Sequence, residues 1–132
     1  MQTDFIKIVY ESNKAPRKFF PSIDEATLVA VIQAAHQRGK LAVVHISDQQ
    51  SALEAVRAGA DGLVHGFIES RVQQALLDLM KARDVFIIPT LAVHEAMTLR
   101  QHNQKYVLDR TDLKLSANQR HNLAKGFTQF NI

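Results

Sequence analysis

The sequence predicts an α/β fold built on a parallel sheet. Short apolar segments rich in β-branched residues alternate with longer amphipathic segments as far as residue 90. The strand-like segments begin near residues 5, 41, 61 and 85. Each connection between them is long enough to hold a crossover helix, as parallel strands require. We therefore expect four parallel strands with flanking helices.

The first half of this pattern contains two strands and one helix. Residues 5–10 form the first predicted strand, with Lys7 as its single charged interruption. Ser22, followed three residues later by Glu25, has the spacing of a capping box, which predicts the start of a helix that ends before Gly39. The apolar run at residues 41–45 is the second strand.

The second half repeats the pattern. Ser47 or Asp48 opens the next helix, which Gly59 ends. The remaining predicted elements are a strand at residues 62–65, a helix at 71–83 and a strand at 85–89.

Beyond the fourth strand the composition becomes polar. Residues 95–107 predict a polar helix, and Ser116 with Gln119 has the spacing of another capped helix start. We therefore expect a single domain over residues 1–132, in which residues 1–92 carry the β/α units and residues 93–132 are mostly helical.

Composition excludes several classes of function. The chain has no Cys, so disulfides, thiolate metal sites and thiol nucleophiles are ruled out. Its 16 Lys and Arg residues are scattered among 13 Asp and Glu residues, without the basic stripe that nucleic acids require. The apolar runs have strand length, and no signal-like segment opens the chain, so we expect no membrane span and a cytoplasmic location.

Polar side chains interrupt three predicted strands. Lys7 lies within the first strand, whereas His45 and His65 end the second and third. Strand alternation predicts that Leu63 and His65 share one face, and that all three polar side chains point inward. Active sites of α/β folds lie at the carboxyl edge of the sheet. Two imidazoles with an oxygen donor from a third strand suit a divalent metal, although each His can instead cap its strand with a hydrogen bond.

Four segments of the chain, taken in order, resemble the amidohydrolase superfamily, and in particular its imidazolonepropionase- and prolidase-like branch. They are Asp-Phe-Ile-Lys-Ile-Val at 4–9, Ala-Ala-His at 34–36 with Gly-Lys-Leu-Ala-Val-Val-His at 39–45, Ala-Gly-Ala-Asp-Gly-Leu-Val-His-Gly at 58–66, and Val-Phe-Ile-Ile-Pro-Thr-Leu at 85–91. The resemblance covers nearly the whole chain and implies a (β/α)8 TIM barrel that holds one or two divalent ions, zinc above all. This chain would supply strands four to seven.

The resemblance also implies roles for individual residues. Lys7 matches the strand-four lysine, which is carboxylated and bridges both ions in binuclear members. His45 and His65 match the metal-binding histidines of strands five and six. Thr90 falls at the end of strand seven, beside the substrate pocket. His94 lies just beyond the fourth predicted strand of this chain, a position from which it can also approach the pocket, the alternative being a solvated loop residue.

Two features of the family pattern are missing. Members have a His-x-His pair on strand one and an Asp on strand eight that acts as the general base. None of the six His residues forms a His-x-His pair, and no strand followed by a suitable Asp comes after Thr90. The resemblance therefore implies a metal-dependent hydrolase of C–N bonds in a small-molecule substrate, present here as a partial barrel that is inactive alone.

Four strands of a barrel leave the interior face of the sheet uncovered. We expect Phe5, Val9, Leu41, Val43 and Leu63 to line that face. A contiguous apolar patch is normally buried by a partner, and two copies supply eight strands, so we expect a homodimer or higher oligomer.

Two other classes of function are weighed against the hydrolase. One is a non-catalytic truncated fragment that self-associates and binds a metal or a small ligand. The other is a doubly wound binding module. That reading is disfavoured because no Gly-rich phosphate loop follows the first strand, where Tyr10 and Glu11 lie instead.

Overall fold

The computed structural model describes residues 3–13, 21–67, 70–91, 112 and 114–125. The chain divides into two compact units, Met1–Thr90 and Leu91–Ile132. In the second unit the described helix is α6 (Ala117–Lys125). The predicted capping box at its start is confirmed, because the Ser116 and Gln119 side chains each accept a hydrogen bond from the backbone N–H of the other residue.

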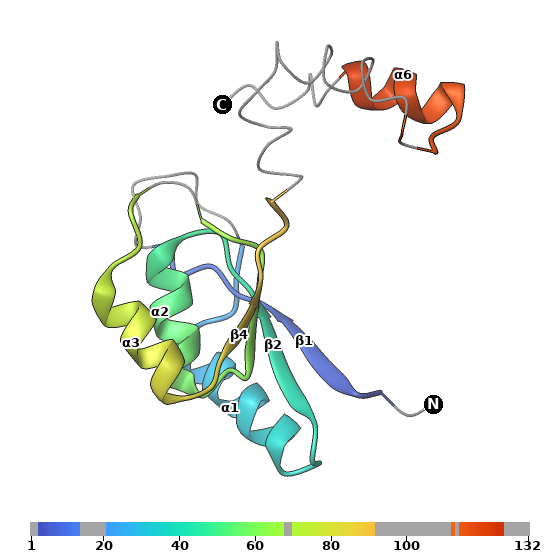
Figure 1. The fold of residues 1–132 in the computed structure, drawn as a ribbon. Helices are drawn as coiled ribbons and strands as arrows, with labels where there is room; N and C mark the ends of the chain where they lie inside the picture. The colour runs from blue at the N-terminus through green and yellow to red at the C-terminus, as the bar shows by residue number, and fades with distance from the viewer. Residues whose placement is uncertain (1–2, 14–20, 68–69, 92–111, 113, 126–132) are drawn as a thin grey trace. The chain divides into compact units, whose positions relative to one another are not determined.

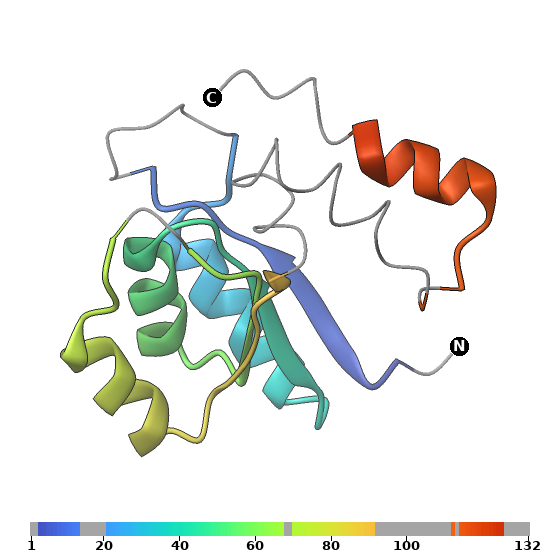
Figure 2. The same cartoon turned by 45° about the horizontal axis from the view of Figure 1, so that its top comes forward.

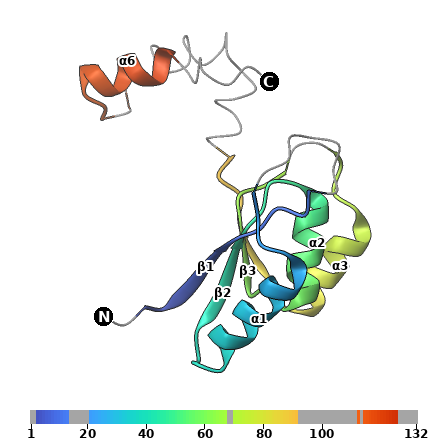
Figure 3. The same ribbon diagram turned by 180° about the vertical axis from the view of Figure 1, so that it is seen from behind.

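The first unit is a four-stranded parallel sheet in the order β1-β2-β3-β4, with helices on one side (Figures 1 and 3). The predicted α/β fold is therefore confirmed. The strands are β1 (Phe5–Val9), β2 (Leu41–His45), β3 (Gly62–Val64) and β4 (Phe86–Ile88). The helices are α1 (Glu25–His36), α2 (Gln49–Ala58) and α3 (Gln74–Ala82). Figure 2 shows α2 beside α3.

The hydrophobic core lies between the sheet and these helices. Ile8, Val44 and Leu63 are in register on neighbouring strands and point toward the helices. They join a buried cluster with the apolar side chains of the helices, including Leu28, Ile32, Val56 and Leu76.

The opposite face of the sheet, which we call the open face, carries exposed apolar side chains. Phe5, Val9, Leu41, Phe86 and Ile88 lie on it and are between 41% and 57% exposed. Val43, in register with Lys7 and Gly62, belongs to the same face but, contrary to the expectation that it is uncovered, is only 4% exposed.

The placement of Leu63 on the open face was wrong. Leu63 is fully buried in the core, because it pairs with Val44, and Val64 takes the open-face position beside His45. Side chains alternate at every residue of a strand, so a one-residue error in register exchanges the two faces.

The predicted N-cap of α1 was also wrong. Asp24, rather than Ser22, caps the helix by accepting a 2.8 Å hydrogen bond from the Thr27 backbone N–H. This bond lowers the pKa of Asp24. The Ser22 hydroxyl instead accepts a hydrogen bond from the Glu11 backbone N–H.

The second helix begins and ends as its sequence predicts. Asp48 caps α2 by accepting from the Ser51 backbone N–H, and Gly59 ends it with a left-handed φ of 102°. None of the helices in the described part of the chain is both long and apolar enough to cross a membrane.

Gly62 allows the Phe86 ring to lie across the open face. A Cβ atom at position 62 would be 2.2 Å from Cζ of Phe86. We expect Gly62→Ala to displace the ring and to lower the free energy of unfolding by about 1 kcal/mol, the low end of the cost of overpacking. In a Phe86→Ala background the same substitution should cost much less. Equal costs in the two backgrounds, measured by denaturant unfolding, would show that the ring does not limit position 62.

Candidate functional site

The carboxyl edge of the sheet brings together two of the predicted site residues. His45 is the last residue of β2, and His65 directly follows β3. Their rings are in contact, with centroids 4.5 Å apart and planes inclined by 75°. Lys7 lies on the same face of the sheet as His45, two positions earlier in the register, where it pairs with Val43.

A left-handed backbone places His65 beside His45. Because Val64 faces the open side, continued alternation would turn the next side chain toward the helices. His65 instead has a φ of 74°, a conformation that is uncommon outside glycine. Its backbone N–H donates to the Ile88 carbonyl at 2.8 Å. Strained backbone of this kind, which costs of order 1 kcal/mol or more, is concentrated at functional sites.

Thr90 holds the His65 ring. Its Oγ1 atom is 3.0 Å from Nδ1 of His65, and Thr90 itself has a left-handed φ of 49°. Thr90 is predicted to border the substrate pocket, and the structure places its hydroxyl against a predicted metal ligand. His94, the other predicted substrate contact, lies outside the described residues.

The environment of His45 favours a neutral ring. Burial, followed by the positive charge of Lys7, lowers the pKa of His45. A neutral imidazole is the form that ligates metals. The Nε2 atom of His45 is 3.5 Å from Oε1 of Glu11.

Glu11 is a site residue that the sequence reasoning missed. It comes two residues after the end of β1, at the same edge of the sheet as His45, and its Oε2 atom accepts a hydrogen bond from Ser47. Burial is the main cause that raises the pKa of Glu11 above its ordinary value. Its place just beyond a strand end was the available signal, because carboxyl ends of parallel strands meet at one edge.

The donor set fits one metal ion only in part. Two imidazoles are in contact, but among the described residues no three His, Cys, Asp or Glu side chains form a group that could hold an ion. Catalytic zinc sites usually have three protein ligands. Within the described part of the chain, a third ligand would therefore be another type of group, and Lys7 becomes an oxygen ligand only when its amine is carboxylated.

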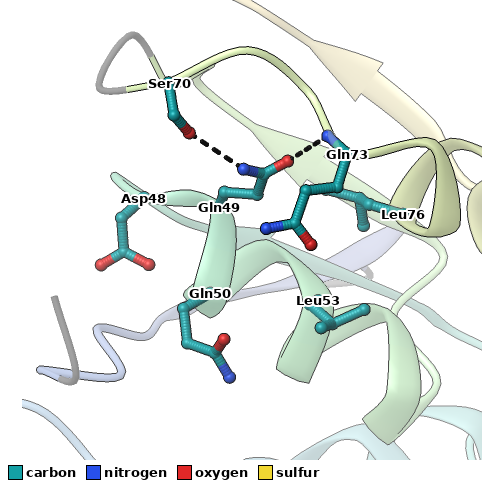
Figure 4. A pocket seen from close by; sticks show the side chains of 7 residues that line it. All are labelled: Asp48, Gln49, Gln50, Leu53, Ser70, Gln73 and Leu76. Atoms are coloured by element: carbon teal, nitrogen blue, oxygen red, sulfur yellow. Dashed lines mark hydrogen bonds between the residues drawn. The ribbon is translucent and has the colours of Figure 1, made fainter.

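A separate small cavity lies between α2 and the segment that leads into α3 (Figure 4). Gln49 crosses it, donating to Ser70 Oγ at 3.0 Å and accepting from the Gln73 backbone N–H. The volume of the cavity is about 190 Å³, which is below the roughly 300 Å³ of the smallest typical ligand pockets. We therefore assign Gln49 the structural role of fixing this segment.

Solved structures with a similar fold include an amidohydrolase, with a TM-score of 0.58 and 20% identity over 94% of this chain and 29% of that one. A second is a Xaa-Pro dipeptidase with methionine bound in its active site. Its TM-score is 0.54, and it has 21% identity over 93% of this chain and 28% of its own. A third is an uncharacterized protein, with a TM-score of 0.57 and 18% identity over 92% of this chain and 29% of its own. No family model and no curated protein matches the chain.

These likenesses agree with the fold that the sequence predicts. The chain spans less than a third of the length of each of these structures. Its first unit has four parallel strands whose connections contain helices, as in one half of an eight-stranded β/α barrel. The chain therefore has the fold of a partial TIM barrel of the kind found in amidohydrolase and prolidase structures.

Proposed function

We propose that the chain is the metal-binding part of an amidohydrolase-type barrel, corresponding to strands four to seven, and that the complete barrel hydrolyses C–N bonds in a small-molecule substrate. The observation that carries this proposal is the contact between His45 and His65 at the carboxyl edge of the sheet, with ring centroids 4.5 Å apart. A left-handed backbone at His65 maintains that contact. We expect the protein to act in the cytoplasm.

His45, His65 and carboxylated Lys7 would hold a divalent ion, with zinc as the expected metal. Because Nδ1 of His65 is engaged by Thr90, the ion would bind His65 at Nε2. A bound zinc ion supplies Lewis-acid polarisation of a carbonyl and lowers the pKa of bound water. In its unmodified form Lys7 is positively charged and opposes the ion.

The 132-residue chain alone should bind zinc weakly and show no detectable hydrolysis. Its sequence has no His-x-His pair, and after Thr90 it predicts no strand that a suitable Asp follows. Catalysis would require those groups from the remainder of a barrel.

Zinc binding tests the proposed site. We expect His45→Ala/His65→Ala to weaken zinc binding by about 100-fold or more, because loss of a ligand should exceed the 10- to 100-fold cost of losing an outer-shell partner. Titration calorimetry on the full chain measures the dissociation constant. His121→Ala is the matched control, because His121 is exposed on α6.

The outcomes separate the hydrolase from the alternative function. Equal zinc affinity in the wild-type chain and the double variant would contradict the site. Metal-dependent hydrolysis of an amide or lactam by the isolated chain would contradict its inactivity alone. If zinc binds but hydrolysis stays undetectable after the missing barrel strands are supplied, the chain is a non-catalytic metal-binding fragment.

We also propose that a second copy of the chain covers the open face. Purely parallel sheets are normally buried on both faces, whereas the described open face exposes large apolar side chains. In the described sheet β1 and β4 are edge strands, so each has an unpaired edge. Two copies related by a twofold axis along the strands would pair β4 of one with β1 of the other, which gives the eight strands of a closed barrel.

A further inference from the structure

The segment that follows β1 is held at three successive residues. Tyr10 donates from its hydroxyl to Glu54 at 2.6 Å, the Glu11 N–H donates to Ser22 Oγ at 2.8 Å, and the Ser12 N–H donates to Ser51 Oγ at 2.9 Å. These bonds tie the segment to α2 and to the residues before α1. Tyr10 and Glu54 are both only 3% exposed, so the hydrogen bond between them is shielded from water. The backbone of Glu11 is therefore fixed independently of its side chain.

The side chain of Glu11 is also held. It is only 10% exposed, and its two oxygens face different partners. Oε2 accepts a hydrogen bond from the Ser47 hydroxyl, which orients the carboxylate. Oε1 then faces Nε2 of His45 at 3.5 Å.

We propose that Glu11 is a positioning residue for His45: its carboxylate accepts from Nε2–H and thereby directs Nδ1 of the same ring toward the metal. This inference rests on the proposed metal site and adds the group that orients one of its ligands. A metal-ligating His usually donates its second ring N–H to a carboxylate or carbonyl, which sets the tautomer and the orientation of the ring.

The two histidines are then held through opposite nitrogens. Glu11 faces Nε2 of His45, and Thr90 contacts Nδ1 of His65. The other ring nitrogens, Nδ1 of His45 and Nε2 of His65, belong to rings already in contact. A role for Glu11 as a direct ligand is less consistent with the structure, because one oxygen is bonded to Ser47 and the other faces the His45 ring.

Zinc affinity provides the first test. Glu11→Ala should raise the dissociation constant for zinc by 10- to 100-fold, in the range of other outer-shell partners. Glu11→Gln keeps the size of the side chain and a carbonyl acceptor, so its effect should be smaller than that of Glu11→Ala. Glu25→Ala, at an exposed position on α1, is the matched control and should leave the affinity unchanged.

Nitrogen-15 NMR of labelled His side chains in the zinc-free chain provides the second test. At a pH above imidazole titration, His45 should carry its proton on Nε2 as a single tautomer. Glu11→Ala should give an averaged signal from both tautomers, an effect that a general loss of stability would not produce.

The two proposals can fail separately. If zinc binding depends on His45 and His65 but is equal in wild type, Glu11→Ala and Glu11→Gln, the positioning role is wrong and the metal site stands. If the wild-type chain binds no zinc, the metal site is wrong. In that case equal His45 tautomer populations in wild type and Glu11→Ala would also overturn the Glu11–His45 interaction, whereas a shift in those populations would uphold it.

Discussion

Leu63→Ala is expected to lower the free energy of unfolding by about 3 kcal/mol, within the range measured for Leu→Ala in protein cores. Leu63 is fully buried between β3 and the helices, in register with Val44 and Ile8. Truncation removes apolar contacts and leaves a cavity that the surrounding helices cannot fill. Denaturant unfolding at a fixed protein concentration measures the change.

Val64→Ala is the matched control for the assignment of faces. Val64 is the next residue of the same strand, and its side chain is half-buried on the open face. Its truncation should cost about 1 kcal/mol or less. A larger loss at Val64 than at Leu63 would mean that β3 is turned over and that the two faces are exchanged.

The wild-type chain is expected to be a homodimer, and Phe5→Lys/Leu41→Lys is expected to convert it to a monomer. Both side chains are about half exposed at the start of their strands on the open face, at the far end from His45. Burying two unpaired ammonium groups per copy in an apolar interface would cost several kcal/mol. Light scattering across micromolar concentrations measures the mass of each variant.

A charge at an exposed apolar position outside the sheet controls for nonspecific effects. Val72 is 42% exposed and precedes α3, so Val72→Lys should remain a dimer. A well-folded wild-type monomer at micromolar concentration would contradict the proposal. So would a double variant that keeps the mass of a dimer, because the contact would then lie on another surface.

The sequence predicts most of the fold because its periodicity is local. The four strands and the described helices follow from short apolar runs, amphipathic spacing and end signals such as Gly59 and the Ser116–Gln119 capping box. Details that depend on tertiary pairing were not predictable. Ser22 and Asp24 are both suitable caps; in the structure Asp24 caps the helix, and Ser22 accepts a hydrogen bond from the distant Glu11 N–H instead.

In the site, too, the details that depend on tertiary contacts could not be predicted from the sequence. Strand ends alone indicated that His45 and His65 would come together, but the alternation used for His65 also placed Leu63 on the wrong face. The left-handed backbone at His65 is what reconciles a core Leu63 with a His65 ring that touches His45. The identity of a single residue does not reveal that its backbone is left-handed. Glu11 joins the site only through the contact of its side chain with His45, which local sequence patterns do not show.

X-ray absorption of the zinc-loaded chain tests the central claim most directly, because it reports the atoms bound to the ion. The metal site predicts two imidazole nitrogens at about 2.0 Å from zinc, with oxygen atoms as the other ligands. The imidazole signal should disappear in His45→Ala/His65→Ala and persist in His121→Ala. A spectrum without imidazole ligands in the wild type, or the same imidazole signal in the double variant, would contradict the claim that His45 and His65 form the metal site.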